Sequence, residues 1–126
     1  MVGVKLGDAI IVGDPHSIEL RSPGPDAAAV YDRDISLGLL YEDKASGEEH
    51  YVVRYAAGTK GRVHTHTAAH TMVVLEGHLY VNGQVIGPGG YAHFPAGQPM
   101  HHQSGGDDGC LFVLIFHGPF DVKLVE

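Results

Sequence analysis

The stretch that decides the fold runs from Gly58 to Gly77 and reads GTKGRVHTHTAAHTMVVLEG. Its three histidines, His64, His66 and His70, are spaced by even numbers of residues. Side chains two residues apart on a β-strand point to the same face, with Cα atoms about 7 Å apart. Two imidazoles placed in this way can reach one ion at the roughly 2.0–2.1 Å of a metal–nitrogen bond. The spacing therefore predicts a metal site on a strand. Whether a bulge or turn interrupts the register before His70 stays open.

Short apolar runs separated by glycine-containing turns lie on both sides of this stretch. We expect strands at residues 35–41, 50–55, 63–76, 79–82, 84–86, 91–94, 102–104, 111–117 and 121–125. The Asn82-Gly83 pair between two of these runs is a strong signal for a two-residue hairpin turn. No run of strand character alternates with a helical pattern, so the sequence predicts an all-β sandwich or barrel.

Composition and net charge indicate a single globular domain and argue against nucleic-acid and membrane partners. A chain of 126 residues with 44% hydrophobic and 18% charged residues is the size and composition of one globular domain. The net charge of −7 argues against a nucleic-acid partner, because binding to phosphates needs a basic face. No apolar run reaches the roughly 18 residues of a membrane span, so we expect no membrane partner. The single cysteine, Cys110, excludes an intrachain disulfide and fits a reducing, cytoplasmic location. We interpret Cys110 as a small buried residue.

A second group of histidines follows a turn rich in proline and glycine. His101 and His102 come directly after Met100, just past the segment PAGQP at 95–99. This turn could bring the following strand alongside the first histidine stretch. The sequence therefore predicts that the two histidine groups meet, although they are more than thirty residues apart.

The two stretches together resemble the cupin superfamily. The first cupin motif reads G-x5-H-x-H-x3,4-E-x6-G, and Gly58 to Gly77 match every spacing, with His70 in place of the glutamate. The second motif, G-x5-P-x-G-x2-H-x3-N, aligns with residues 89–104. Gly89, Pro95 and Gly97 match its first half, but Met100 occupies the histidine position. More narrowly, the chain resembles the cupin domain of zinc-binding anti-sigma factors and related small single-domain cupins.

The resemblance implies a jelly-roll barrel, the double-stranded β-helix, of about six to eight strands with a divalent ion inside it. The chain then forms a single cupin domain, 1–126. We expect an N-terminal arm and first strands at 1–34 and a barrel core at 35–117 that carries metal motifs at 58–77 and 89–104.

The resemblance also implies a ligand set that begins with His64, His66 and His70. Replacing the usual glutamate by His70 removes one negative charge and gives an all-imidazole site. Imidazole ligands suit a divalent transition metal, Fe, Zn, Ni, Mn or Cu, better than Mg or Ca. If His70 turns away, three histidines and open coordination positions remain.

The motif does not directly identify the fourth ligand. Its spacing places Met100 at that position, and a thioether is a poor ligand for a hard divalent ion. We expect a one-residue bulge after Gly97, which would turn His101 inward as the fourth ligand and leave His102 facing outward. Without that bulge, the two histidines exchange roles.

Three functions compete at the level of the sequence. The first is a metal-dependent oxidoreductase, dioxygenase-like, that acts on a small organic molecule. The second is a non-enzymatic metal- or ligand-sensing or binding protein, as the resemblance to the anti-sigma cupin domain implies. The third is an isomerase or lyase, which needs a base that the sequence does not clearly supply. The apolar run from Leu111 to Phe116 and the free sheet edges further predict a homodimer.

Overall fold

Among the residues that the structure describes, the named elements are ten antiparallel β-strands and one short 3-10 helix. The computed structural model of the chain describes residues 3–25 and 29–125. The elements in order are η1 (Pro15–Ser17), β1 (Ser36–Asp43), β2 (Glu48–Tyr55), β3 (His64–Thr65), β4 (His70–Gly77), β5 (Leu79–Val81), β6 (Gln84–Ile86), β7 (Tyr91–Phe94), β8 (His102–Ser104), β9 (Cys110–Phe116) and β10 (Lys123–Leu124).

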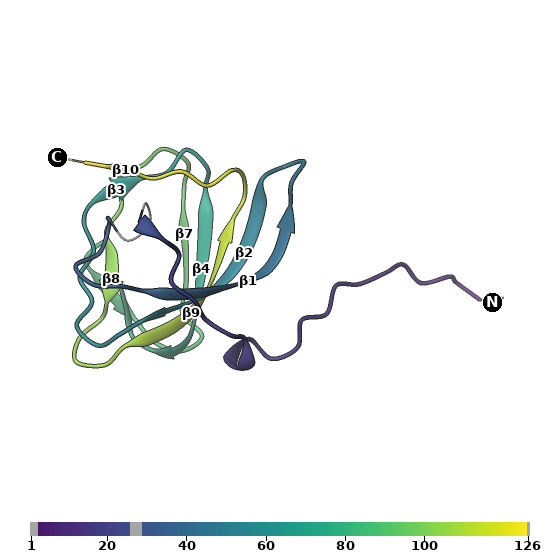
Figure 1. Ribbon diagram of the computed structural model, residues 1–126, viewed down its shortest axis with the longest axis horizontal. Helices are drawn as coiled ribbons and strands as arrows, with labels where there is room; N and C mark the ends of the chain where they lie inside the picture. Colours follow the sequence, from purple (N-terminus) through teal and green to yellow (C-terminus); the bar gives the residue numbers. More distant parts are fainter. Residues whose placement is uncertain (1–2, 26–28, 126) are drawn as a thin grey trace.

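The strands form two facing layers around a closed interior. A five-stranded sheet has the order β1-β2-β9-β4-β7, and it faces a three-stranded sheet, β6-β5-β8, and a two-stranded sheet, β10-β3. Figure 1 shows the long strands β4 and β2 on one side of the barrel and β3, β8 and β10 on the other. An isolated bridge between His64 and Met100 joins β3 to the segment that enters β8. The predicted all-β jelly-roll barrel is confirmed.

The apolar core lies between these layers and is built by strand alternation. Strand β9 pairs with β2 on one side and β4 on the other, so both of its long edges are satisfied. Its inward residues, Phe112, Leu114 and Phe116, alternate with outward ones as the two-residue period of a strand requires. Met72 of β4 and Tyr55 of β2 meet them in the same core.

The predicted strand at 63–76 is in fact two strands. Strand β3 ends at Thr65, a bend follows, and β4 begins at His70 in the other sheet. The break exists because the chain crosses between layers there. Hydrogen bonds from Gly97 N to His66 O and from His117 N to Ala69 O hold the crossing segment. As a result, the first histidine group approaches the interior from two sheets.

The predicted hairpin at Asn82-Gly83 is confirmed by its backbone. Both residues have positive φ, 45° and 93°, which is the conformation of a type I′ turn. The pairing of Val81 with Gln84 closes the two-residue loop between β5 and β6.

The N-terminal region contains no regular strand among its described residues before Ser36. It holds η1, whose first turn is capped by the Asp14 side chain, and an isolated bridge between Arg21 and Leu37 of β1. Figure 1 shows the chain before η1 leading away from the barrel. In the part of the chain that the structure describes, no helix has the length and apolar character needed to cross a bilayer.

Candidate metal centre

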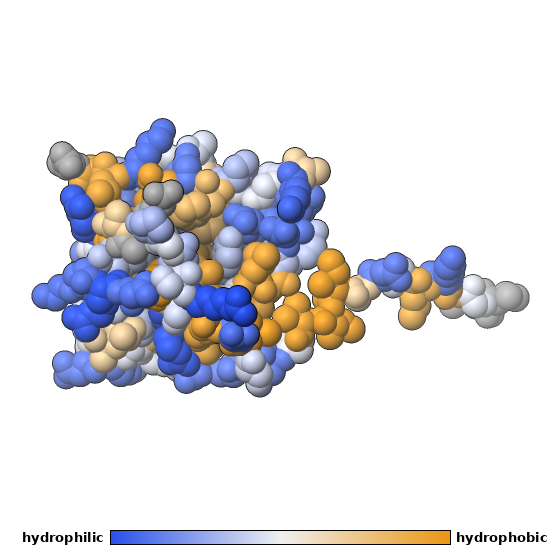
Figure 2. Space-filling view, in the orientation of Figure 1, coloured by the Kyte–Doolittle hydropathy of each residue, from blue (hydrophilic) through white to orange (hydrophobic). Residues whose placement is uncertain are grey.

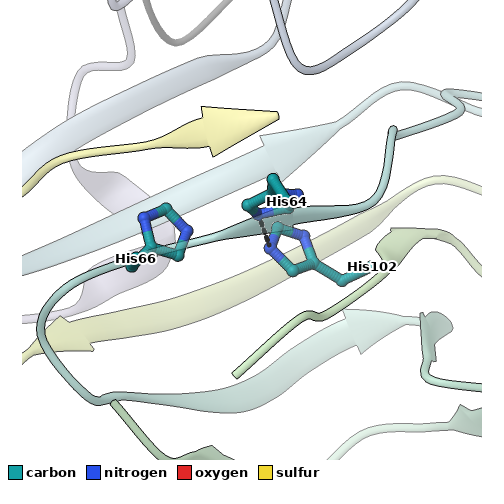
Figure 3. A group of neighbouring side chains, drawn as sticks. All are labelled: His64, His66 and His102. Carbon is teal, nitrogen blue, oxygen red and sulfur yellow. Dashed lines mark hydrogen bonds between the residues drawn. The ribbon is translucent and has the colours of Figure 1, made fainter. Parts of the chain in front are cut away.

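Three buried histidines meet inside the barrel. His64, His66 and His102 are each at most 5% exposed, and one ring nitrogen from each lies within 4.8 Å of the other two. Figure 3 shows that His64 and His66 come from one segment of the chain, whereas His102 reaches them from strand β8. A ring nitrogen is the ligand atom that histidine offers to a metal. The arrangement therefore fits a site for one metal ion.

The spacing of two of these nitrogens agrees with shared coordination. Nε2 of His64 and Nε2 of His102 are 3.1 Å apart, and a dashed line joins the two rings in Figure 3. Two nitrogens bound at about 2.1 Å to one ion are about 3.0 Å apart at a right angle and about 3.4 Å apart at a tetrahedral angle. The observed separation lies between these values, so both rings are placed to share an ion.

Backbone carbonyls fix the tautomers of the first two histidines. Nδ1 of His64 lies 2.7 Å from the carbonyl oxygen of Arg62, and Nδ1 of His66 contacts the carbonyl oxygen of Asp121. A carbonyl oxygen only accepts, so each Nδ1 must carry the proton and donate. The lone pair of each ring is then left on Nε2. Outer partners of this kind orient metal-binding histidines and raise their basicity.

A pair of tyrosines supports the third histidine. The Tyr55 hydroxyl lies 2.8 Å from Nδ1 of His102, and the Tyr31 hydroxyl lies 2.6 Å from that of Tyr55. A hydroxyl both donates and accepts, so Tyr55 can serve either tautomer of His102. When His102 Nε2 gives its lone pair to a metal, its Nδ1–H donates to Tyr55. The same contact therefore suits the ligand form of this ring.

His70 lies beside the cluster and has an unusual environment. Its side chain is fully buried, and neither ring nitrogen has a hydrogen-bond partner. The ring stacks on Phe94 with centroids 4.6 Å apart, and its centroid is 4.8 Å from that of His66. Buried polar atoms almost always have a partner, because leaving one unsatisfied costs about 1–3 kcal/mol. An ion or an ion-bound ligand would supply the partner that His70 lacks.

Burial keeps all four imidazoles neutral. Burial, together with the smaller effect of neighbouring histidines, lowers the pKa of His64 to about 4 and that of His70 to about 3. Burial likewise lowers the pKa of His66 and, more strongly, that of His102. Only a neutral imidazole has the free lone pair that binds a metal. The four rings are therefore in the ligand form at neutral pH.

The structure does not bring His101 into the cluster, and His102 takes the place expected for it. Nε2 of His101 lies 2.9 Å from Gly61 O and 3.0 Å from the Gln103 side chain, outside the barrel interior. The expected bulge after Gly97 is not needed. Met100 and His102 are both buried and His101 is not, which is the simple alternation of a strand. The sequence signal that could have identified His102 is its position two residues after Met100, because residues two apart on a strand face the same side.

An apolar cavity of about 300 Å³ opens beside the four histidines. Apart from the four histidines, its lining is aliphatic and aromatic and includes three tyrosines. These lining residues are Pro23, Val30, Tyr31, Ile35, Leu37, Tyr51, Val53, Tyr55, Met72, Leu114, Phe116, Phe120 and Val122. None of the described residues that line it is a carboxylate, a lysine or an arginine. The volume and lining suit a small organic molecule. The sequence did not reveal which aromatic residues line this space, because their neighbours come from distant segments.

Comparisons with known proteins agree with this fold. Residues 28–121 match the ChrR cupin-like domain family. A cupin-like protein from Thermotoga maritima is 17% identical with a TM-score of 0.72, and the alignment covers 86% of this chain and 87% of that one. The polyketide cyclase RemF from Streptomyces resistomycificus is 17% identical with a TM-score of 0.74, over 94% and 87% of the two chains.

A further solved structure is described as a candidate acetylacetone dioxygenase from Methylibium petroleiphilum. It is 18% identical with a TM-score of 0.72, and the alignment covers all of this chain and 86% of that one. At these identities the likeness concerns the fold alone. The comparison with curated proteins gave no match. The family match covers most of the chain, including both histidine groups, and the chain therefore belongs to the ChrR cupin-like domain family of small cupins.

Proposed function

We propose that this protein is a metal-dependent oxidoreductase, dioxygenase-like in type, that acts on a small organic molecule. The observation that carries the proposal is the cluster of neutral, buried histidines in the wall of an apolar cavity. We assign His64, His66 and His102 as ligands of one divalent transition metal, with His70 as the fourth. A metal bound there supplies Lewis acidity toward an oxygen ligand and, if it is iron, reactivity toward O2.

The surrounding residues have separate tasks in this proposal. The carbonyl oxygens of Arg62 and Asp121 hold the rings of His64 and His66 with Nε2 free to bind. The Tyr55 hydroxyl oxygen accepts a hydrogen bond from Nδ1–H of His102 when that ring is in its ligand form. The apolar wall excludes bulk water, which strengthens the interaction of the substrate with charged groups inside the site.

The charge balance of the site favours an anionic substrate. Four neutral imidazoles leave the full double charge of the metal uncompensated, and no carboxylate is among the described residues that line the cavity. Burying a net charge in apolar surroundings is costly unless a counter-charge comes with it. We therefore propose a substrate that binds through anionic oxygen atoms, such as a diketone in its enolate form or a phenolate.

The first experiment tests metal binding and reaction together. Protein purified without added metal is analysed for bound metals, then loaded with Fe(II) and assayed for oxygen uptake on a panel of diketones and phenolic compounds. His66→Ala should remove most of the metal and all uptake. The matched control is His78→Ala, because His78 is exposed and its ring hydrogen-bonds Asp108 rather than a member of the histidine cluster. Equal metal content in both variants would refute the assigned site.

A second experiment tests the charge argument with azide as the anion probe. His70→Glu adds one negative charge beside the metal, and at a separation of about 6 Å and an effective dielectric constant of about 20 this costs roughly 3 kcal/mol. Azide affinity of the Fe(II)- or Co(II)-loaded protein, followed by absorption spectroscopy, should fall by about 100-fold. Unchanged or tighter azide binding in that variant would contradict the anionic-substrate proposal.

The alternative is a metal- or ligand-sensing protein without catalysis. The match to the ChrR cupin-like domain favours it, because the chain resembles the cupin domain of anti-sigma factors, which are regulators. A four-coordinate ion closed by four imidazoles has no position for a substrate, as in structural zinc sites. X-ray absorption of the bound metal distinguishes the two. Four nitrogen ligands without water, together with no oxygen uptake on any compound of the panel, would favour the sensor. Additional oxygen ligands would favour the enzyme.

A further inference from the structure

The N-terminal arm, defined here as residues 3–13, exposes an apolar surface that the described part of the chain leaves largely uncovered. Val4, Leu6, Ile10, Ile11 and Val12 are between 44% and 86% exposed. Figure 2 shows hydrophobic side chains along the arm where it leaves the barrel, and Figure 1 shows that its backbone leads away from the sheets. An extended apolar segment held in water is the kind of surface that marks a protein contact.

The base of the arm is held on the barrel, which sets its direction. The Asp14 side chain caps η1, and Nε2 of His16 lies 3.5 Å from a carboxylate oxygen of Glu76 on β4. The eleven residues of the arm can span about 36 Å when extended. This reach is enough to cross the sheet of a neighbouring molecule.

The outer face of the five-stranded sheet has a matching apolar row. Strand register places one residue of each strand side by side across this face, in the order Gly38, Val52, Val113, Val73 and Tyr91. The chain itself covers one end of the row. Val52 is fully buried, and a Cβ on Gly38 would lie 2.6 Å from Cγ2 of Ile18. At the other end, Tyr91 is 65% exposed, so the apolar row continues beyond the part that the chain covers.

We propose that the arm of one copy lies across the open end of this row, over Tyr91 and Val73, on a second copy, and that the two copies exchange arms reciprocally. The segment around Ile18 already covers the same row at its other end, so the arm extends a packing mode that the fold uses. A second copy supplies both surfaces, as an isologous dimer requires. This inference goes beyond the proposed function and does not depend on a bound metal.

Charge and area both fit this occupant. The arm contains Lys5 and Asp8 and is neutral overall, so it approaches the acidic barrel of another copy without repulsion. Burying one large aliphatic side chain removes about 100 Å² of apolar surface from water, so five give about 500 Å² per arm. Two exchanged arms with the surfaces that they cover would bury about 2,000 Å², which is enough for a stable dimer.

The test is the oligomeric state of the full chain by light scattering and sedimentation over 1–100 µM. The unaltered chain should have twice its 13.4 kDa mass, and the double substitution Leu6→Asp/Ile11→Asp should weaken association by at least 100-fold. Both residues lie in the exposed arm, so the barrel should keep its circular dichroism spectrum. A monomeric unaltered chain, or a dimer that survives the double substitution, would overturn the proposal.

Two further variants locate the surface that receives the arm. Tyr91→Asp should weaken the dimer as the arm variant does, whereas Val85→Asp should not, although Val85 is also exposed, at 55%, on β6 of the other layer. Equal loss from both variants would overturn the assignment. Isotope-filtered NMR on mixed labelled and unlabelled copies should show contacts between arm methyl groups and the Tyr91 ring of the other copy. Absence of such contacts in a dimer would also overturn it.

Discussion

The replacement His102→Ala, set beside His101→Ala, tests the ligand assignment most sharply. The two residues are adjacent in the sequence, but only the His102 ring lies in the cluster, with its Nε2 3.1 Å from that of His64. Apparent zinc-binding free energies of about 10–16 kcal/mol in four-ligand sites correspond to about 3 kcal/mol per ligand. Losing one ligand should therefore weaken metal binding about 100-fold.

The assay is competition for Zn(II) or Co(II) against a coloured chelator, at pH 7.5 and fixed salt. His101→Ala removes contacts to Gly61 O, to the Gln103 side chain and to the Tyr80 ring, none of which belongs to the histidine cluster, so its affinity should stay within about threefold of the unaltered protein. Urea unfolding of both metal-free variants separates loss of ligation from loss of folding, because removing the buried His102 ring also leaves a cavity. A larger loss of metal affinity from His101→Ala than from His102→Ala would refute the assignment.

Three other predictions follow from the same geometry. Tyr55→Phe should lower metal affinity by about 10- to 100-fold, because the Nδ1–H of the ligand form of His102 then loses its nearer acceptor and keeps only the Tyr31 hydroxyl at 3.4 Å, and affinity unchanged in the chelator assay would contradict this. In the metal-free protein, burial lowers the pKa of His64 to about 4 and of His70 to about 3, whereas both titrate near 6.5 when unfolded. As the pH falls below about 6.5, the unfolded chain therefore binds more protons than the folded protein. The free energy of unfolding, measured with urea, should be highest above pH 6.5 and should decline toward pH 4 by up to about 1.4 kcal/mol per pH unit for each histidine. A free energy of unfolding that does not change over this pH range would contradict the prediction. Burial raises the pKa of Cys110 to about 12, so at pH 8 only about one thiol in 10,000 is ionised, and Ellman's reagent should react no faster than the protein unfolds.

The sequence by itself determined the fold class and most of the candidate site. Its two-residue periodicity, glycine turns and Asn82-Gly83 hairpin depend on local backbone preferences, and these survive in the structure. The even spacing of His64 and His66 placed them on one side of the chain, and the motif spacing pointed to a second histidine group opposite. These are properties of neighbouring residues, which local sequence can specify.

The tertiary structure determined which side chains from distant segments of the chain meet at the site. It assigned His102 rather than His101 to the cluster, because the register of the segment around Met100 against His64 fixes which side chain faces inward. It brought the hydroxyl of Tyr55 to His102 across 47 residues of sequence, and the carbonyl of Asp121 to His66 across 55. It also left both nitrogens of His70 without partners in the core. Local preferences specify which way a strand alternates, but only the packing of two sheets determines which atoms meet between them.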